Sequence, residues 1–344
     1  MRKTDISKYG EFGLIDHLTQ NVRIRNASTE KGIGDDAAVL AYNSLKTLVS
    51  TDLLLEGIHF DLTYVPLRHL GYKSAVVNFS DIYAMRGIPK QITVSLGISK
   101  RFSVEDLEEF YAGVYLACEQ YGVDLVGGDT SSSLTGLTVS VTCIGAAEEG
   151  KIVYRDGAKE NDLICVSGNL GAAYMGLQLL EREKSIFDKV EDVQPDFVGK
   201  EYLLERQLKP EARKDIIELL EKNMIVTTAM IDVSDGLSSD IKHICKQSKV
   251  GCRIYEDRIP IDYQTAVMAE EFNMNITTVA LNGGEDYELL FTVPLYLYDK
   301  ISAINEVRII GNITNQSLGE YLVTRDNSEI ELEAQGWNSI AEKE

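Results

Sequence analysis

Acidic residues recur beside apolar runs in this sequence, and carboxylates placed in this way are typical of a site for a hard divalent cation. Asp35 and Asp36 are adjacent on the Gly-x-Gly turn of KGIGDDAAVL, and Asp52 follows Ser50 and Thr51 at the end of the next apolar run. Two unit charges about 4 Å apart repel by about 4 kcal/mol at an effective dielectric constant of 20. Adjacent carboxylates on a tight turn therefore favour a cation bound through oxygen ligands. For one Asp-Asp pair alone, a solvated acidic turn is the simpler interpretation.

Repetition of the acidic turns in both halves of the chain favours the metal site. The further acids are Asp81, Asp129, Asp232, Asp235, Glu285 and Asp286. Asp81 lies in an apolar helical pattern, where a carboxylate needs a partner. Because strand ends on one rim of a sheet converge, we expect these carboxylates to share one cleft. The sequence places no His/Cys cluster beside them, so Mg²⁺ is favoured over zinc. Several Mg²⁺ ions in an acidic cleft would bridge phosphate oxygens during phosphoryl transfer.

Two stretches imitate nucleotide-binding motifs, and neither fits. Residues 32–37 (GIGDDA) match the dinucleotide fingerprint, but a second strand follows where that fingerprint needs a helix, and two carboxylates would repel a pyrophosphate. Residues 145–151 (GAAEEGK) match the first seven positions of a P-loop, but Ile152 replaces the required hydroxyl. We interpret the second stretch as a hairpin turn.

The apolar periodicity predicts elements that would position these acids in an α+β fold. Predicted helices cover residues 11–22, 67–86, 104–121, 172–183, 201–207, 210–222 and 263–272. Predicted strands cover residues 37–40, 47–50, 91–98, 124–127, 137–147, 162–167, 229–232, 251–259, 289–293, 307–313 and 321–325. We expect Asp129 at the tip of a Gly-Gly turn. Gly168 and Gly171 open a helix whose N-terminus either faces an anion or is a simple helix entry.

Length and composition suit two domains, which we place at residues 1–148 and 149–344 of the 344-residue chain. The net charge of −20 argues against nucleic acid or an anionic membrane as the main partner. Five scattered cysteines without CxxC spacing fit reduced thiols. The N-terminus has no apolar signal core, and no run approaches the roughly 20 apolar residues of a membrane span. We therefore expect a cytoplasmic protein.

Seven motifs taken together resemble the thiamine-monophosphate kinase family, of the superfamily that includes aminoimidazole ribonucleotide synthetase and selenophosphate synthetase. The motifs are GIGDDAAVL, STDLLLEGIHF, GYKSAVVNFSDIYAM, GGDT, YRDGAK, IDVSDGL and GGEDYEL, and the resemblance extends from Gly10 to Trp337. The sequence departs from the family pattern at Tyr83 and Arg86, where the family usually has small residues, so the packing beside Asp81 is not carried over.

The resemblance implies a two-domain α+β fold that dimerises through N-terminal strands, with the active site in a cleft between the domains. The implied reaction is direct in-line transfer of the ATP γ-phosphoryl group to thiamine monophosphate, the last step in making thiamine diphosphate, with no general base. The implied Mg²⁺ ligands are Asp36, Ser50, Thr51, Asp52, Asp81, Asp129, Asp232 and Asp235. The implied ATP contacts are Gly128, Asp129, Arg155 and Ser234, and the implied substrate contacts are His59, Glu285 and Trp337.

Simpler interpretations remain for several of these residues. Arg155 is a solvated boundary residue by default, His59 a structural histidine, and Trp337 a residue that closes a core. Glu285 can accept hydrogen bonds from its own glycine turn. Selenophosphate synthesis is disfavoured because the first cysteine is Cys118. A Mg²⁺-dependent phosphatase and a non-enzymatic metal-binding module would also use such a set of acids.

Overall fold

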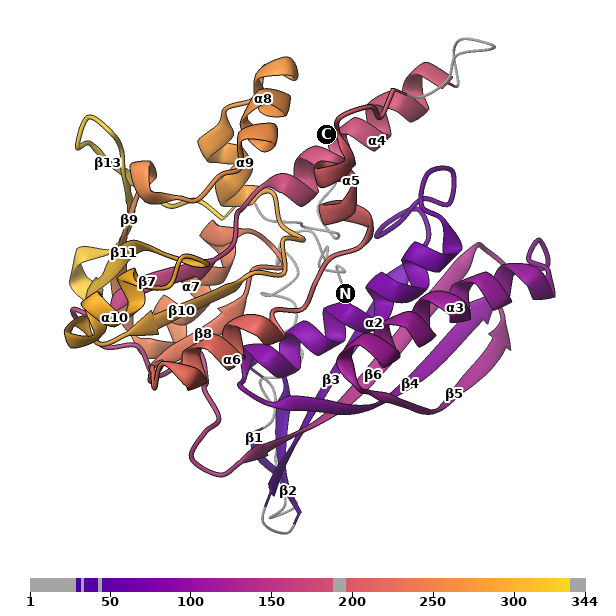
Figure 1. Cartoon of the computed structure of the whole chain (residues 1–344), viewed down its shortest axis with the longest axis horizontal. Helices are drawn as coiled ribbons and strands as arrows, with labels where there is room; N and C mark the ends of the chain where they lie inside the picture. Colours follow the sequence, from indigo (N-terminus) through magenta and orange to yellow (C-terminus); the bar gives the residue numbers. More distant parts are fainter. Residues whose placement is uncertain (1–28, 32–33, 43–44, 188–195, 335–344) are drawn as a thin grey trace, which may run out of the picture.

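The computed structural model describes residues 29–31, 34–42, 45–187 and 196–334 as an α+β protein built from two mixed sheets (Figure 1). The helix predicted over residues 11–22 and the substrate contact predicted for Trp337 lie outside these residues. Within them, no helix is both long and apolar enough to cross a membrane.

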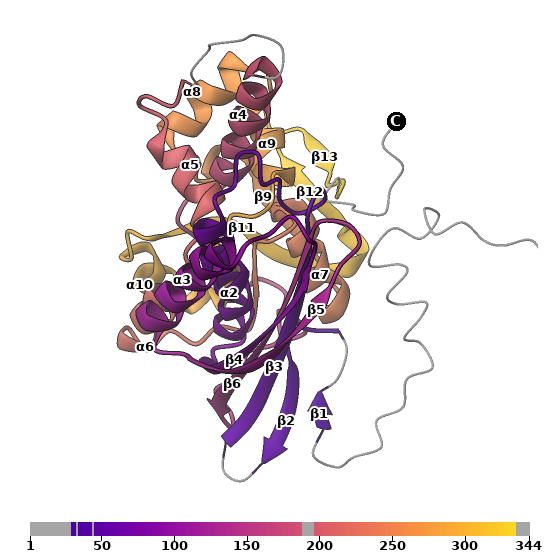
Figure 2. The same cartoon turned by 90° about the vertical axis from the view of Figure 1, so that its right-hand side faces the viewer.

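The first half contains a six-stranded sheet with the order β1-β2-β3-β6-β4-β5, in which β4 and β5 run parallel and the other neighbours antiparallel. Its elements are β1 (Thr29–Lys31), β2 (Ala38–Tyr42), β3 (Leu45–Leu55), α2 (Leu67–Ala84), β4 (Ile88–Ile98), α3 (Val104–Tyr121), β5 (Asp124–Ser132) and β6 (Leu137–Glu148). Helices α2 and α3 pack on one face of the sheet (Figure 2). On the other face, Leu53 remains 53% exposed.

The second half contains a seven-stranded sheet with the order β13-β12-β9-β11-β7-β10-β8, in which β12 and β9 run parallel. Its strands are β7 (Leu163–Ser167), β8 (Ala229–Asp232), β9 (Val250–Tyr255), β10 (Leu289–Val293), β11 (Val307–Asn315), β12 (Glu320–Val323) and β13 (Glu329–Glu331). Its α-helices are α4 (Ala172–Phe187), α5 (Glu201–Leu208), α6 (Lys214–Lys222), α7 (Leu237–Ser248), α8 (Tyr263–Glu271), α9 (Ile276–Asn282) and α10 (Tyr298–Ser302). Every residue of β7, β8 and β10 is buried.

Helix α2 joins the two halves. It contacts α3 and the strands of its own sheet on one side, and β8 and α5 of the second half on the other. Fourteen of its eighteen residues are buried, so it has no polar face of the kind that a surface helix shows. One hydrophobic core accordingly includes residues of both halves. The predicted boundary at residue 148 coincides with the last residue of β6, but the separation into two domains stays a prediction.

Several predicted elements are wrong in detail. The structure has no turn at the Gly-Gly pair before Asp129, because β5 continues to Ser132. A side chain at Gly128 would place its Cβ 1.9 Å from the Val94 carbonyl oxygen, so this glycine permits close approach of β4 rather than a turn. The helix predicted from Pro210 begins at Lys214. Helices α9 and α10 were not predicted.

Candidate functional site

A cavity of about 1180 Å³ lies between the two halves and collects most of the predicted site residues. Of the predicted residues, Asp36, Ser50, Thr51, Asp52, His59, Asp81, Arg155, Ser234, Asp235 and Glu285 line it. Drug-sized ligands usually occupy cavities of about 300–1,000 Å³, so this cavity has room for more than one small ligand. Carboxylates dominate one end of it, which agrees with the expectation of a shared acidic cleft.

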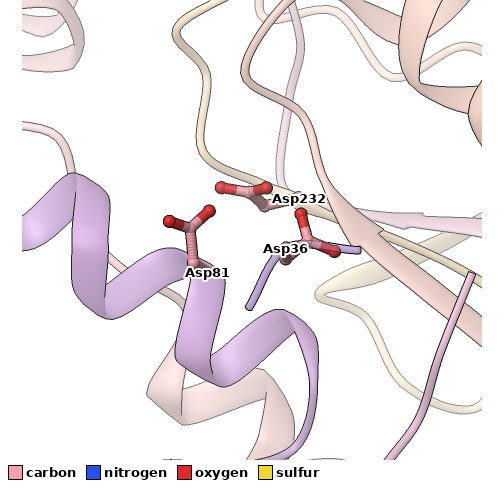
Figure 3. A group of neighbouring side chains, drawn as sticks. All are labelled: Asp36, Asp81 and Asp232. Atoms are coloured by element: carbon pink, nitrogen blue, oxygen red, sulfur yellow. The ribbon is translucent and has the colours of Figure 1, made fainter. Parts of the chain in front are cut away.

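Three carboxylates from distant parts of the chain meet at this acidic end. Asp36 lies in the bend that precedes β2, Asp81 projects from α2, and Asp232 is the last residue of β8 (Figure 3). One oxygen from each lies within 4.8 Å of the others. At this distance two unit charges repel by about 3.5 kcal/mol at an effective dielectric constant of 20, so positive charge beside the cluster would stabilise it.

Burial favours the neutral form of Asp52, Asp81 and Asp232, and repulsion between carboxylates adds to this effect at Asp81 and Asp232. Burial, with repulsion from Asp36, raises the pKa of Asp232 to about 8. Burial also raises the pKa of Asp81 well above its ordinary range, with repulsion from Asp52 and Asp232 adding to it. Burial alone raises the pKa of Asp52 to about 6. Hydroxyl donors oppose the effect, since Ser80 Oγ donates to Asp232 at 2.5 Å and Ser50 Oγ donates to Asp81.

Arg155 supplies positive charge to the cluster from the segment that connects the two sheets. Its Nε donates to Asp36 Oδ2 at 3.0 Å, and its Nη2 donates to the other oxygen of Asp36. Asp35 lies behind this pair with a side chain that is fully buried, 3.0 Å from the Lys31 Nζ atom. Burial opposes the charge of Arg155, but Asp36 and Asp35 raise its pKa above the ordinary value. The guanidinium is therefore not a solvated boundary group.

Strand β3 presents its site residues to both faces of the first sheet. Ser50 bonds Asp81 and so faces helix α2, and Asp52 shares that face because side chains alternate along a strand. Thr51 points the other way, and its Oγ1 donates to the Val141 carbonyl oxygen at 3.1 Å. Asp52 lies within the strand rather than in a turn after it, which corrects the predicted strand end.

Gly128 and Asp129 do not join the cluster within one chain. Asp129 lies on the edge strand β5, which is three positions from β3 in the sheet order. It pairs with Ser95 of the neighbouring strand β4. Three strand spacings of about 4.8 Å separate β5 from β3 by about 14 Å. The Asp129 side chain shares the face of Ser95, opposite the helices, and it is exposed. The expectation that all the predicted acidic residues share one cleft at the strand ends is therefore wrong for Asp129 within one chain.

The loop between α9 and β10 carries Glu285 into the cavity on a strained backbone. Glu285 and Tyr287 have φ angles of 56° and 51°, a left-handed conformation that non-glycine residues rarely adopt and that clusters at functional sites. The Glu285 amide donates to the Ser234 carbonyl oxygen at 2.7 Å, and the Tyr287 amide donates to that of Val233 at 2.9 Å. These bonds join the two acidic turns of the second half.

Asp286 settles the two interpretations of the glycine-led helix entry at α4. Its Oδ2 accepts a hydrogen bond from the Gly171 amide at 2.7 Å. Burial raises the pKa of this carboxyl to about 6, although the nearby Arg206 lowers it. The anion at this helix N-terminus is thus the protein's own carboxylate, and Asp286 is not part of the cluster formed by Asp36, Asp81 and Asp232.

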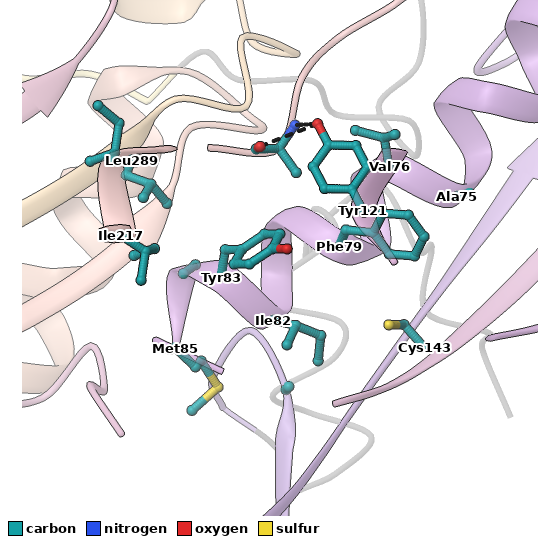
Figure 4. Packing of buried hydrophobic residues seen from close by; sticks show 14 of the residues in the cluster. Ala75, Val76, Phe79, Ile82, Tyr83, Met85, Tyr121, Cys143, Ile217 and Leu289 are labelled. Atoms are coloured by element: carbon teal, nitrogen blue, oxygen red, sulfur yellow. Dashed lines mark hydrogen bonds between the residues drawn. The ribbon is translucent and has the colours of Figure 1, made fainter. Parts of the chain in front are cut away.

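His59 and the departures from the family pattern are accommodated structurally. His59 lines the cavity, and its Nδ1 accepts a hydrogen bond from the Leu55 amide at 3.0 Å. Tyr83 is buried between Tyr121 and the second half, where Figure 4 shows Ile217 and Leu289 beyond it. Arg86 follows the end of α2 with a φ angle of 57°, and its Nη1 donates to the Ile225 carbonyl oxygen of the second half. Neither departure displaces the Asp81 carboxylate from the cluster.

Sequence reasoning missed three buried or lining residues that hold Glu285 and the cavity wall: Lys73, Gln207 and Tyr287. Lys73 had a detectable signal. It is the one Lys or Arg in the apolar stretch of α2 from Leu70 to Ala84 and lies seven residues before Ser80, two helical turns away on the same face. Gln207 and Tyr287 follow no periodic pattern that would distinguish them.

Models for two parts of one protein family match the chain. The N-terminal domain of AIR synthase related proteins matches residues 34–147, and their C-terminal domain matches residues 159–320. Together these matches cover most of the chain.

Relatives with assigned activities and solved structures agree with these matches. A thiamine-monophosphate kinase of Aquifex aeolicus (strain VF5) is 37% identical, covering 88% of this chain and 92% of that protein. One of Bacillus subtilis (strain 168) is 34% identical, covering 95% and 98%. The structure of AaThiL complexed with AMPPCP and TMP has a TM-score of 0.82 at 35% identity, covering 98% of this chain and 99% of that chain. A hydrogenase maturation protein HypE in complex with ATP, at 18% identity and a TM-score of 0.67, shows the shared fold alone.

Proposed function

The chain belongs to the thiamine-monophosphate kinase family of AIR synthase related proteins, and we propose that it transfers the γ-phosphoryl group of ATP directly to thiamine monophosphate. The products are thiamine diphosphate and ADP. The observation that carries the proposal is the convergence of buried Asp232 with Asp36 and Asp81, which line a cavity large enough for both substrates.

The residues at the acidic end fit Mg²⁺. Their donors are carboxylate and hydroxyl oxygens, which this hard cation prefers, and burial raises the pKa of both Asp81 and Asp232. The ligands that we propose are Asp36, Ser50, Asp52, Asp81, Asp232 and Asp235, together with Thr51 and Asp129, whose side chains lie on the other face of the first sheet. Bound Mg²⁺ would neutralise the charge that develops on the transferring phosphoryl group.

Arg155 and Ser234 are the ATP contacts that we propose within one chain. Arg155 holds both oxygens of Asp36, which is also a proposed metal ligand. A cation at Asp36 would take over part of that interaction and free guanidinium donors for a phosphate oxygen, which Arg binds in a similar forked geometry. The acceptor is an ionised phosphate oxygen, so the chain needs no general base. His59, Glu285 and Trp337 are the proposed contacts of thiamine monophosphate.

We further propose a homodimer in which Gly128 and Asp129 reach the site of the partner subunit. Asp129 lies about 14 Å from β3 on the opposite face of the sheet, and Leu53 on that face is exposed. Mixing an Asp129→Asn variant with an Asp81→Asn variant tests this arrangement. If Asp129 serves the partner, mixed dimers regain one intact site, whereas a site built within one chain leaves every dimer inactive.

A coupled ADP-release assay with the purified chain tests the function. We expect ADP only when thiamine monophosphate and Mg²⁺ are both present, in equal amount to thiamine diphosphate measured by chromatography. ADP and free phosphate formed without thiamine monophosphate would instead support a Mg²⁺-dependent phosphatase. The five buried free cysteines support our proposal that the enzyme works in the cytoplasm, where thiols stay reduced.

A further inference from the structure

Lys73 is a buried cation on helix α2 whose partners lie in the other half of the protein. Its side chain is 7% exposed, and its Nζ lies 3.0 Å from Glu285 Oε1. The same Nζ donates to the backbone carbonyl oxygen of Gln207 at 3.0 Å. A buried ammonium group is costly unless it is paired and hydrogen-bonded, so these two contacts specify where Glu285 and α5 sit relative to α2.

Glu285 is held from behind while its side chain stays open to the cavity. Its Oε2 accepts a hydrogen bond from Gln207 Nε2 at 2.9 Å, so Lys73 and Gln207 each take one of the two carboxylate oxygens. The Glu285 side chain is nevertheless 32% exposed, and the residue lines the cavity. A carboxylate offers about four acceptor positions, and two donors from the protein leave the others for a ligand.

The chemistry of this arrangement is selective. An ionised carboxylate only accepts hydrogen bonds, so a fixed Glu285 attracts a ligand group that donates, such as an amino group on a ring, and repels a carbonyl oxygen at the same place. A carboxylate free to rotate would discriminate less, because it could turn away from the mismatched group into water. A fixed carboxylate therefore selects ligands that place a hydrogen-bond donor at this position, whereas a mobile one would only attract positive charge.

We propose that Lys73 is a positioning residue for acceptor specificity: together with Gln207 it fixes Glu285 to select a substrate ring that carries an amino group. This inference rests on the proposed function, in which the aminopyrimidine of thiamine monophosphate supplies the amino group. Lys73 itself contacts neither substrate in this scheme and acts through Glu285.

The test compares Lys73→Met with Lys73→Arg, using thiamine monophosphate and its analogue with a carbonyl oxygen in place of the pyrimidine amino group. A charge-assisted hydrogen bond corresponds to about a tenfold to hundredfold effect. We expect Lys73→Met to raise KM for thiamine monophosphate by at least about tenfold, to leave KM for ATP within about twofold, and to lower the preference for the amino compound over the analogue. Lys73→Arg should restore part of the preference.

Lys151→Met is the matched control, because Lys151 forms an ion pair of the same 3.0 Å length with Glu148 but is 55% exposed. It should change none of these quantities. In a Glu285→Gln background, Lys73→Met should have no further effect on the preference, since Lys73 acts through that carboxylate. If Lys73→Met does not fold, Gln207→Leu removes the other donor and must show the same shift of preference.

The outcomes separate the inference from the proposed function. A wild-type chain that neither binds nor phosphorylates thiamine monophosphate would refute the proposed function. The role of Lys73 alone would be overturned if the wild-type chain phosphorylates thiamine monophosphate and Lys73→Met keeps the wild-type preference for the amino compound over the analogue. Where Lys73→Met does not fold, the same outcome in Gln207→Leu would overturn it. An equal rise in KM for both ATP and thiamine monophosphate would also overturn it, because that pattern marks a structural defect.

Discussion

Replacing Asp232 by Asn should make the metal-free protein more stable while it abolishes activity. Asp232 has a pKa raised from its ordinary value of 3.8 to about 8, through burial and repulsion from Asp36. Holding this carboxyl ionised in the folded protein then costs on the order of 5 kcal/mol. Asn has nearly the same shape, can still accept the hydrogen bond from Ser80, and carries no charge.

The raised pKa of Asp232 determines how the free energy of unfolding changes with pH. Because the folded protein binds this proton more tightly than the unfolded chain does, the metal-free protein loses stability as pH rises from about 4 to about 8. The advantage of Asp232→Asn should therefore be about 2 kcal/mol at pH 5 and about 5 kcal/mol at pH 8. Added Mg²⁺ should reduce the advantage at pH 8, since the cation stabilises only the wild-type cluster.

Urea unfolding in a chelator at the two pH values measures these free energies, with Asp299→Asn on an exposed position of α10 as the control. We expect the control to behave as the wild type at both values. Equal stability of Asp232→Asn and wild type at pH 8, or a difference that does not grow between pH 5 and pH 8, would refute the argument from crowded carboxylates. High kinase activity in Asp232→Asn would remove this residue from the metal ligands that we propose.

Three further predictions concern the substrates and the metal. Arg155→Ala should weaken ATP binding by about 1.5–3 kcal/mol, whereas Lys151→Ala should change it by less than about 0.5 kcal/mol; the reverse order in a binding titration would return attention to the P-loop-like stretch. The reaction rate at fixed MgATP should keep rising with free Mg²⁺, and saturation at one equivalent would exclude several ions. Trp337→Ala should raise KM for thiamine monophosphate and not for ATP, so an equal effect on both would assign this residue to the core.

Some elements could be predicted from the sequence because local signals specify them. Helix α3 was predicted from Val104 to Tyr121, the residues it covers. Ser103 and Asp106 form a capping box at its start, and Gly122 ends it with a φ angle of 70°. Such signals act within a few residues of the chain, so they need no knowledge of the fold.

Other features depend on contacts between distant segments and were therefore missed or misread. A Gly-Gly pair such as the one before Asp129 is typical of a turn. Gly128 instead lets the backbone of β5 come close to β4, and only the order of strands in the sheet shows that these two strands are neighbours. Proline is common at the first position of a helix, so Pro210 predicted a helix start. The Ala212 amide instead donates to the Tyr121 hydroxyl at 2.9 Å, and the helix begins at Lys214. Asp36, Asp81 and Asp232 were each singled out from the sequence, but only the tertiary structure brings them within 4.8 Å.

The burial of α2 between the two halves makes the stability of each half depend on the other. Phe79 and Ile82 are fully buried in a core that also includes Ile217 and Leu289 of the second half. Either half produced alone would expose apolar faces normally covered by the other, a patch typical of aggregation. The two sheets should consequently unfold in one cooperative transition, and a nick in the connecting segment 149–162 should leave both pieces associated.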